Sequence, residues 1–144
     1  MKKNFLIMLF IFTVAACMER DHTPEGALKD FIEARIGKVV TREFVLERVT
    51  GKMKQSFENM SDDDFAKFSD LRNVKRNSFK VLSKSCQESK CFLTYLIGFN
   101  TNDQFHSEVK KIAEMSHIDG KWYIEDISNI KTYHESLEAI NPLE

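Results

Sequence analysis

The sequence lacks both an excess of positive charge and a long hydrophobic run. Its 144 residues include 21 lysines and arginines against 22 acidic residues. Nucleic-acid-binding domains normally present a basic surface, so we expect no nucleic-acid partner. The longest apolar run, Phe5–Val14, is about half of the roughly 20 residues that a helix needs to cross a bilayer. A permanent transmembrane anchor is therefore not expected.

Motifs for catalysis and for metal binding are also missing. The three cysteines form no Cys-x-x-Cys motif, no glycine-rich phosphate loop is present, and no serine lies between the glycines of a nucleophile elbow. The acidic run Asp62–Asp64 does not fit an EF-hand loop, which requires a glycine and a distal glutamate. We therefore expect no cofactor, no metal and no catalytic residue.

The N-terminal segment contains the parts of an export signal. Lys2 and Lys3 precede the apolar run, and the small residues Ala15 and Ala16 lead to Cys17. Val14-Ala15-Ala16-Cys17 resembles the lipobox of bacterial lipoprotein precursors. The resemblance implies cleavage between Ala16 and Cys17, and attachment of a lipid such as palmitate to the Cys17 sulfur. Lipid chains on Cys17 would then hold the chain at a membrane.

This interpretation divides the chain into a signal peptide (1–16), a short tether (17–22) and a single domain (23–144). Loss of Lys2 and Lys3 with the signal peptide lowers the basic count from 21 to 19, so the remaining chain is mildly acidic. Met18 is not the aspartate that retains such proteins at the inner membrane. The expected location is therefore the cell envelope, at the outer membrane facing the periplasm.

The cysteine count agrees with an oxidising compartment. If Cys17 carries lipid, Cys86 and Cys91 remain as an even pair. They lie between two runs with strand-like alternation, so they would face each other across a hairpin at a distance that suits a bridge. We predict a disulfide between Cys86 and Cys91, with free thiols as the alternative.

The first half of the domain has the spacing of amphipathic helices. Thr23-Pro24-Glu25 is typical of a helix start, and Gly37 is typical of a helix end. A second helix is expected from Thr41 with an interruption at Thr50-Gly51, and Ser61 is expected to cap a further helix through Asp62–Asp64.

From Ser78 onward the apolar pattern changes to the period of two that is typical of strands. Four strands are expected, the last ending near Ile130. Asp119-Gly120 predicts a tight hairpin in which His117 opposes Trp122 and Met115 opposes Ile124. Thr132 and Glu135 resemble a capping box, so a short C-terminal helix is expected.

Helices followed by antiparallel strands predict an α+β domain in which helices pack in a curved antiparallel sheet of about four strands. The opening Thr23–Ala34 and the closing Ile118–Ile124 resemble the first helix and last hairpin of small lipoproteins with a nuclear transport factor 2-like domain. Cystatin-like sheets are the related alternative. The resemblance implies a cone with a concave pocket, and Tyr95, His117 and Trp122 are its candidate residues.

Two functions remain open at this point. The first is a non-catalytic, membrane-anchored module that binds an envelope protein or a small apolar ligand. The second is a small enzyme, such as an isomerase, dehydratase or hydrolase, with a histidine or aspartate in the cone. Its candidate groups would be Tyr95, His106, His117, Tyr123, Asp126 and His134. Because no motif places an acid and a base together, the sequence favours the binding module.

The lipid attachment predicts a dependence of partner binding on Cys17. We expect Cys17→Ala to release the protein from the membrane, because the lipid would be lost with the thiol. Affinity purification from solubilised envelope, with mass spectrometry of co-eluting proteins and ligands, would compare the variant with the wild type. Membrane retention and unchanged partners in Cys17→Ala would contradict the anchor.

Overall fold

The computed structural model describes residues 22–101 and 105–136, which form four helices followed by four strands. The helices are α1 (Pro24–Arg35), α2 (Arg42–Leu46), α3 (Gly51–Asn59) and α4 (Asp62–Ser69). The strands are β1 (Val74–Gln87), β2 (Lys90–Thr101), β3 (Phe105–Ile118) and β4 (Lys121–Ser136). They form one antiparallel sheet in the order β1-β2-β3-β4.

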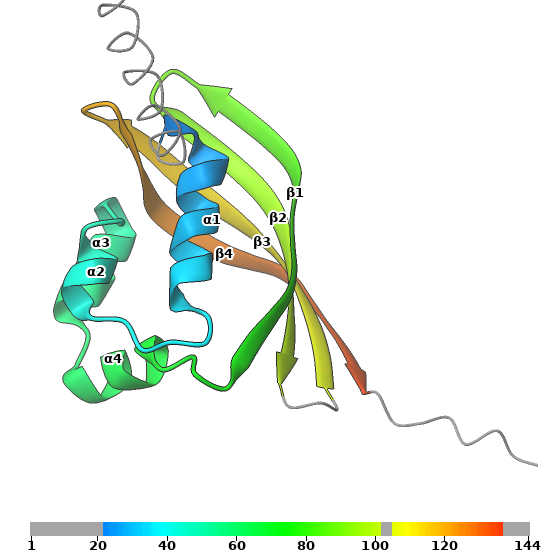
Figure 1. Cartoon of the computed structure of the whole chain (residues 1–144). Helices are drawn as coiled ribbons and strands as arrows, with labels where there is room; N and C mark the ends of the chain where they lie inside the picture. The colour runs from blue at the N-terminus through cyan, green and yellow to red at the C-terminus, as the bar shows by residue number, and fades with distance from the viewer. Residues whose placement is uncertain (1–21, 102–104, 137–144) are drawn as a thin grey trace, which may run out of the picture.

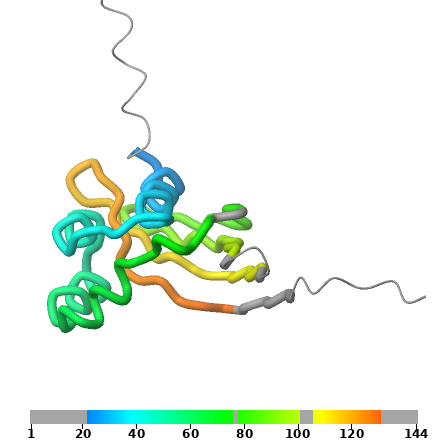
Figure 2. Tube along the Cα trace, turned by 60° about the horizontal axis from the view of Figure 1, so that its bottom comes forward, coloured from blue at the N-terminus to red at the C-terminus, as the bar shows by residue number. Residues whose placement is uncertain are grey.

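The helices lie on one face of the curved sheet (Figure 1). Helix α1 runs across the concave side of the strands, and α2, α3 and α4 lie beside it near the β4 edge (Figure 1). Figure 2 shows the same arrangement, with the far ends of β3 and β4 extending away from α3 and α4. The helices therefore cover only part of the inner face of the sheet.

Side-chain caps fix where the helices begin. The Thr23 hydroxyl accepts a hydrogen bond from the Gly26 amide at 3.1 Å, and the Thr41 hydroxyl accepts one from Phe44 at 3.2 Å. Ser61 caps α4 in the same way. Each cap satisfies an amide that has no partner within its own helix. These starts agree with the helix starts predicted from the sequence.

The core lies between α1 and the inner face of the sheet. Leu28 and Phe31 of α1 are almost completely buried, as are alternate residues of β2 and β3. Other buried residues come from the shorter helices and from β4. The core residues are Leu28, Phe31, Ile32, Val45, Val49, Phe57, Phe65, Cys91, Leu93, Tyr95, Ile97, Ala113, Met115 and Ile124.

The β3–β4 hairpin has the predicted register. His117 pairs with Trp122 and Met115 pairs with Ile124. At Ile124 the outer edge of β4 is also covered, because Val49 forms a parallel bridge to it. The Ile124 amide donates to the Arg48 carbonyl at 3.0 Å, and the Thr50 amide donates to the Ile124 carbonyl at 2.8 Å. These bonds attach the α2–α3 connection to the sheet.

The predicted C-terminal helix is wrong. Thr132 and Glu135 lie in β4, where they pair with Val109 and His106. Backbone pairing with the long β3 outweighs the local capping pattern, because a short helix there would leave the β3 edge unpaired. The first strand also begins earlier than predicted, at Val74 and not at Ser78. The predicted fold class with its terminal helix therefore needs correction.

Two glycines with positive φ allow a steric prediction. Gly37 has φ +72 and open space around it, whereas Gly51 has φ +53 and a built Cβ would lie 2.7 Å from Cγ of Glu125. We expect Gly37→Ala to cost about 1 kcal/mol of stability through backbone strain alone. Gly51→Ala should cost about 2 kcal/mol or more, because Glu125 must also move. Chemical denaturation of both variants measures this difference, and equal losses would contradict it.

Candidate functional site

A cavity of about 380 Å³ lies beyond the C-terminal end of α1, between that helix and the inner face of the sheet. We call it the α1 cavity. Most of its lining is apolar, and three longer polar side chains reach it. The lining residues are Phe31, Ile32, Arg35, Ile36, Leu71, Val74, Tyr95, Ile97, Phe99, Ser107, Lys111 and Ile127. A volume of this size is within the range of small-molecule sites.

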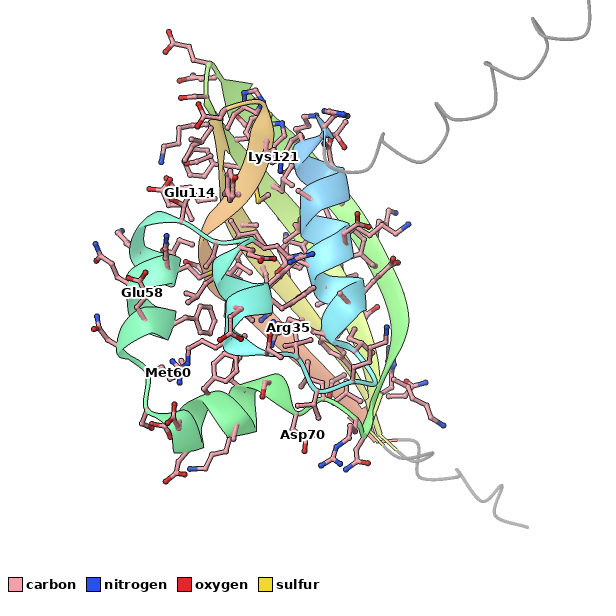
Figure 3. All side chains as sticks on the ribbon, turned by 60° about the vertical axis from the view of Figure 1, so that its left-hand side comes forward. Arg35, Glu58, Met60, Asp70, Glu114 and Lys121 are labelled. Atoms are coloured by element: carbon pink, nitrogen blue, oxygen red, sulfur yellow. A yellow bond between two sulfur atoms is a disulfide. The ribbon has the colours of Figure 1, made fainter. Side chains whose placement is uncertain are left out.

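Arg35 enters the α1 cavity from the last turn of α1. Its guanidinium carbon lies 3.9 Å from the ring centre of Phe68 and 5.1 Å from that of Phe31. One terminal nitrogen donates to the Phe68 carbonyl at 3.3 Å, while Nε is buried with no hydrogen-bond partner among the described residues. Burial lowers the pKa of Arg35 to about 10. Figure 3 shows Arg35 beside the strands of the sheet.

Tyr95 and Lys111 enter the cavity from the sheet. They are register partners on β2 and β3, so their side chains lie next to each other on one face. Burial raises the pKa of the Tyr95 hydroxyl, whose ring packs against Phe79 with centres 5.6 Å apart. Burial also lowers the pKa of Lys111, and the positive charge of Arg35 lowers it further. The two cations are therefore close enough to repel each other.

A second cavity, of about 600 Å³, lies at the β3–β4 hairpin. We call it the hairpin pocket. It is more polar than the α1 cavity and includes charges from α1, the α2–α3 connection and the hairpin. Its lining residues are Ala27, Asp30, Leu46, Glu47, Arg48, Val49, Thr50, Lys54, Ile118, Lys121, Trp122 and Tyr123.

The structure does not bring the three predicted pocket residues together. Trp122 lines the hairpin pocket, whereas Tyr95 lines the α1 cavity. His117 packs on Trp122 with ring centres 4.8 Å apart. Lys111, the partner of Tyr95, precedes His117 by six residues on β3, which corresponds to about 20 Å along the strand. One ligand of ordinary size cannot contact Tyr95 and Trp122 together.

The other candidate groups are also dispersed. His106 Nδ1 lies 3.0 Å from the Asn100 side-chain oxygen, and Asp126 accepts a hydrogen bond from the Ile127 amide at 2.8 Å. The side chain of His134 lies outside the described part of the chain, as do Ala16 and Cys17. Their predicted roles are not tested by the structure.

Cys86 and Cys91 form a disulfide. They are direct register partners at the end of the β1–β2 hairpin, which agrees with the predicted pairing. The bridge lies at the end of the sheet where α1 begins, since Lys84 of β1 forms an ion pair with Glu25 of α1. The disulfide is thus remote from the α1 cavity and acts on the stability of the hairpin.

Residues 22–101 and 105–136 contain neither a candidate metal site nor a candidate membrane span. No group of three or more histidine, cysteine or acidic side chains there is arranged to hold a metal ion. No helix in that part of the chain has the length and apolar character needed to cross a bilayer.

Arg35 and Lys111 were missed as site residues, although the sequence contains a signal for each. Arg35 follows Leu28 and Phe31 at the spacing of one helix face, and Lys111 alternates with Ala113 and Met115 on one strand face. A cation on each apolar stripe therefore points toward the same interior. The paired signal becomes visible only when α1 is placed on β3.

One solved structure is similar to this chain in fold. It is the solution structure of a SEC-C motif containing protein from Rhodopseudomonas palustris, with a TM-score of 0.58 and 12% sequence identity, covering 76% of this chain and 80% of that one. At this identity the similarity concerns the fold alone. No protein-family model matches the chain, and no curated protein matches it either.

This comparison corrects the family resemblance. The structural neighbour is described by its SEC-C motif, so the predicted nuclear transport factor 2-like cone is wrong, and so is the resemblance to small lipoproteins that carry it. The comparison also gives no support to a lipoprotein signal peptide. The resemblance failed because its segments, Thr23–Ala34 and Ile118–Ile124, describe how a helix and a hairpin pack, which different families share.

The unpaired cations of the α1 cavity predict that one substitution stabilises the protein. Because the folded state lowers the pKa of Lys111, its charged form costs stability at neutral pH, and this cost disappears as the pH rises toward the unfolded pKa. We expect Lys111→Met to raise the free energy of unfolding by about 1 kcal/mol at pH 7.

The matched control is Lys110→Met, since Lys110 pairs with Leu96 on the opposite face of the sheet. Thermal and chemical denaturation at pH 7 and at pH 10 would compare the two variants. A loss of stability in Lys111→Met, or the same change in both variants, would contradict the assignment of Lys111 to a desolvated site.

Proposed function

We propose that this domain is a non-catalytic module that binds a small apolar ligand in the α1 cavity. The observation that carries the proposal is the cavity itself, whose walls include Phe31, Ile97 and Ile127. Concave, mostly apolar sites with a few convergent polar groups are the usual form of small-molecule sites.

The polar groups of the cavity support binding over catalysis. General acid–base chemistry at neutral pH commonly uses an imidazole or a carboxylate near the substrate. None of the described residues that line the α1 cavity is a histidine, an aspartate or a glutamate. Raising the pKa of Tyr95 keeps its hydroxyl protonated, which makes it a hydrogen-bond donor and not a base.

The proposal includes a membrane location, which rests on the N-terminal sequence alone. Lipid on Cys17 would attach the domain to the outer membrane facing the periplasm, through a tether that ends just before α1. A site for an apolar ligand suits such a location, because membranes are where apolar molecules concentrate. An envelope protein as the partner remains the alternative to a small ligand.

Filling the cavity tests the proposal. Ile36 lies at the rim of the α1 cavity, and Ile118 lies exposed at the distant hairpin. Ile36→Trp should lower the affinity for an environment-sensitive apolar dye at least tenfold, because the indole would occupy the ligand volume. Ile118→Trp, the same substitution elsewhere, should leave the affinity unchanged.

Fluorescence titration measures both variants, and circular dichroism checks that each is folded. If the wild type binds no apolar dye, or if Ile118→Trp and not Ile36→Trp weakens binding, the α1 cavity is not the ligand site.

A further inference from the structure

The α1 cavity contains two positive charges without a carboxylate partner, whereas several cations elsewhere in the described chain form ion pairs. Lys84 pairs with Glu25 at 2.8 Å, Arg42 pairs with Asp62 at 2.9 Å, and Arg72 pairs with Asp70 at 2.6 Å. Among the described residues, neither Arg35 nor Lys111 has a carboxylate partner, and burial lowers the pKa of both side chains.

Two unpaired cations inside one cavity are energetically unfavourable. Removing a charge from water costs free energy, which the aromatic rings and the single hydrogen bond of Arg35 offset in part and which a counter-charge would offset further. Arg35 has its Nε–H buried without a partner, and the repulsion between Arg35 and Lys111 adds to the cost. An anionic group placed between them would satisfy both side chains.

The hydrogen-bond donors in this part of the cavity match a carboxylate. Arg35 offers N–H groups of its guanidinium, Lys111 offers an ammonium group, and Tyr95 offers a hydroxyl directly beside Lys111. All three are donors when protonated, and charge-assisted bonds to a carboxylate are the stronger class of hydrogen bond. No acidic group of the described lining would repel the ligand.

The remainder of the cavity matches an apolar chain. Beyond the donors, its walls are aliphatic and aromatic side chains from β1, β2, β4 and the α4–β1 connection, namely Leu71, Val74, Ile97, Phe99 and Ile127. The volume of about 380 Å³ is near the lower limit for small-molecule sites, which favours a single short chain over a two-chain lipid.

The geometry points to a small anionic amphiphile as the ligand of the α1 cavity, with its carboxylate held by Arg35, Lys111 and Tyr95 and its chain on the apolar walls. This inference rests on the proposed function, because it assigns a ligand class to the same cavity. The carboxylate of the ligand would supply the counter-charge that the described part of the chain does not provide.

Three amphiphiles with the same chain length test the inference. Calorimetric titration of the full-length protein with decanoate, decanol and decylamine, each below its critical micelle concentration, compares a negative, a neutral and a positive head group on one chain. We expect decanoate to bind at least tenfold more tightly than decanol, and decylamine to bind more weakly than both.

Two lysine variants locate the head-group site. Lys111→Met should lower the affinity for decanoate about tenfold and leave that for decanol unchanged, although the variant is expected to be more stable than the wild type. Lys110→Met removes the same charge from the opposite face of the sheet and should change neither affinity. A loss of binding in Lys111→Met therefore cannot be attributed to unfolding.

The outcomes separate the inference from the proposed function. If decanoate and decanol bind equally, or if Lys111→Met leaves decanoate binding intact, the anionic head-group site is wrong while the apolar cavity stands. If neither amphiphile binds the wild type, the ligand-binding function fails and the head-group site fails with it. Amide chemical-shift changes near Lys111 and Tyr95, absent near Trp122, would place decanoate in the α1 cavity.

Discussion

The packing of one short helix on one long sheet determines the rest of this structure. Helix α1 has 12 residues and is therefore about 18 Å long, whereas β3 has 14 residues and is about 46 Å long. Leu28 and Phe31 fix the helix over the middle of the inner face. The helix therefore ends before the sheet does, and the uncovered part of the inner face forms the wall of the α1 cavity.

The same mismatch explains why cations line that cavity. Side chains that follow the inward pattern of α1 and β3 point into the interior whether they are apolar or charged. At two such positions the chain has Arg35 and Lys111, long side chains that line the α1 cavity beside its apolar walls. Leucine at either position would extend the core. The cations instead leave this space unfilled and make the cavity positively charged.

Local signals in the sequence were sufficient to predict the helix starts and the register of the β3–β4 hairpin. Thr23, Thr41 and Ser61 cap helices where predicted, because capping depends on residues within one turn. The His117–Trp122 pairing followed from Asp119-Gly120, since a two-residue turn fixes the register of both strands. The terminal helix failed because its evidence was equally local, while the competing partner, β3, begins some 27 residues earlier at Phe105.

The candidate site could not be assembled from the sequence, because its residues come from elements whose relative placement is a property of the tertiary fold. Tyr95, His117 and Trp122 were grouped by their chemistry and by an implied cone, yet the strand rise places the first far from the other two. Tyr95 lines the α1 cavity, where Lys111 and Arg35 are the other long polar side chains.

This arrangement links the stability of the empty protein to its preference for an anionic ligand. A cavity that lacks an internal counter-charge is least stable when empty, so any group that neutralises Arg35 and Lys111 stabilises the fold by binding it. The cost of the empty state is thus the source of selectivity for an anion over a neutral molecule of the same shape. Replacing Lys111 by an apolar residue lowers the cost and the selectivity together, because this unpaired charge contributes to both.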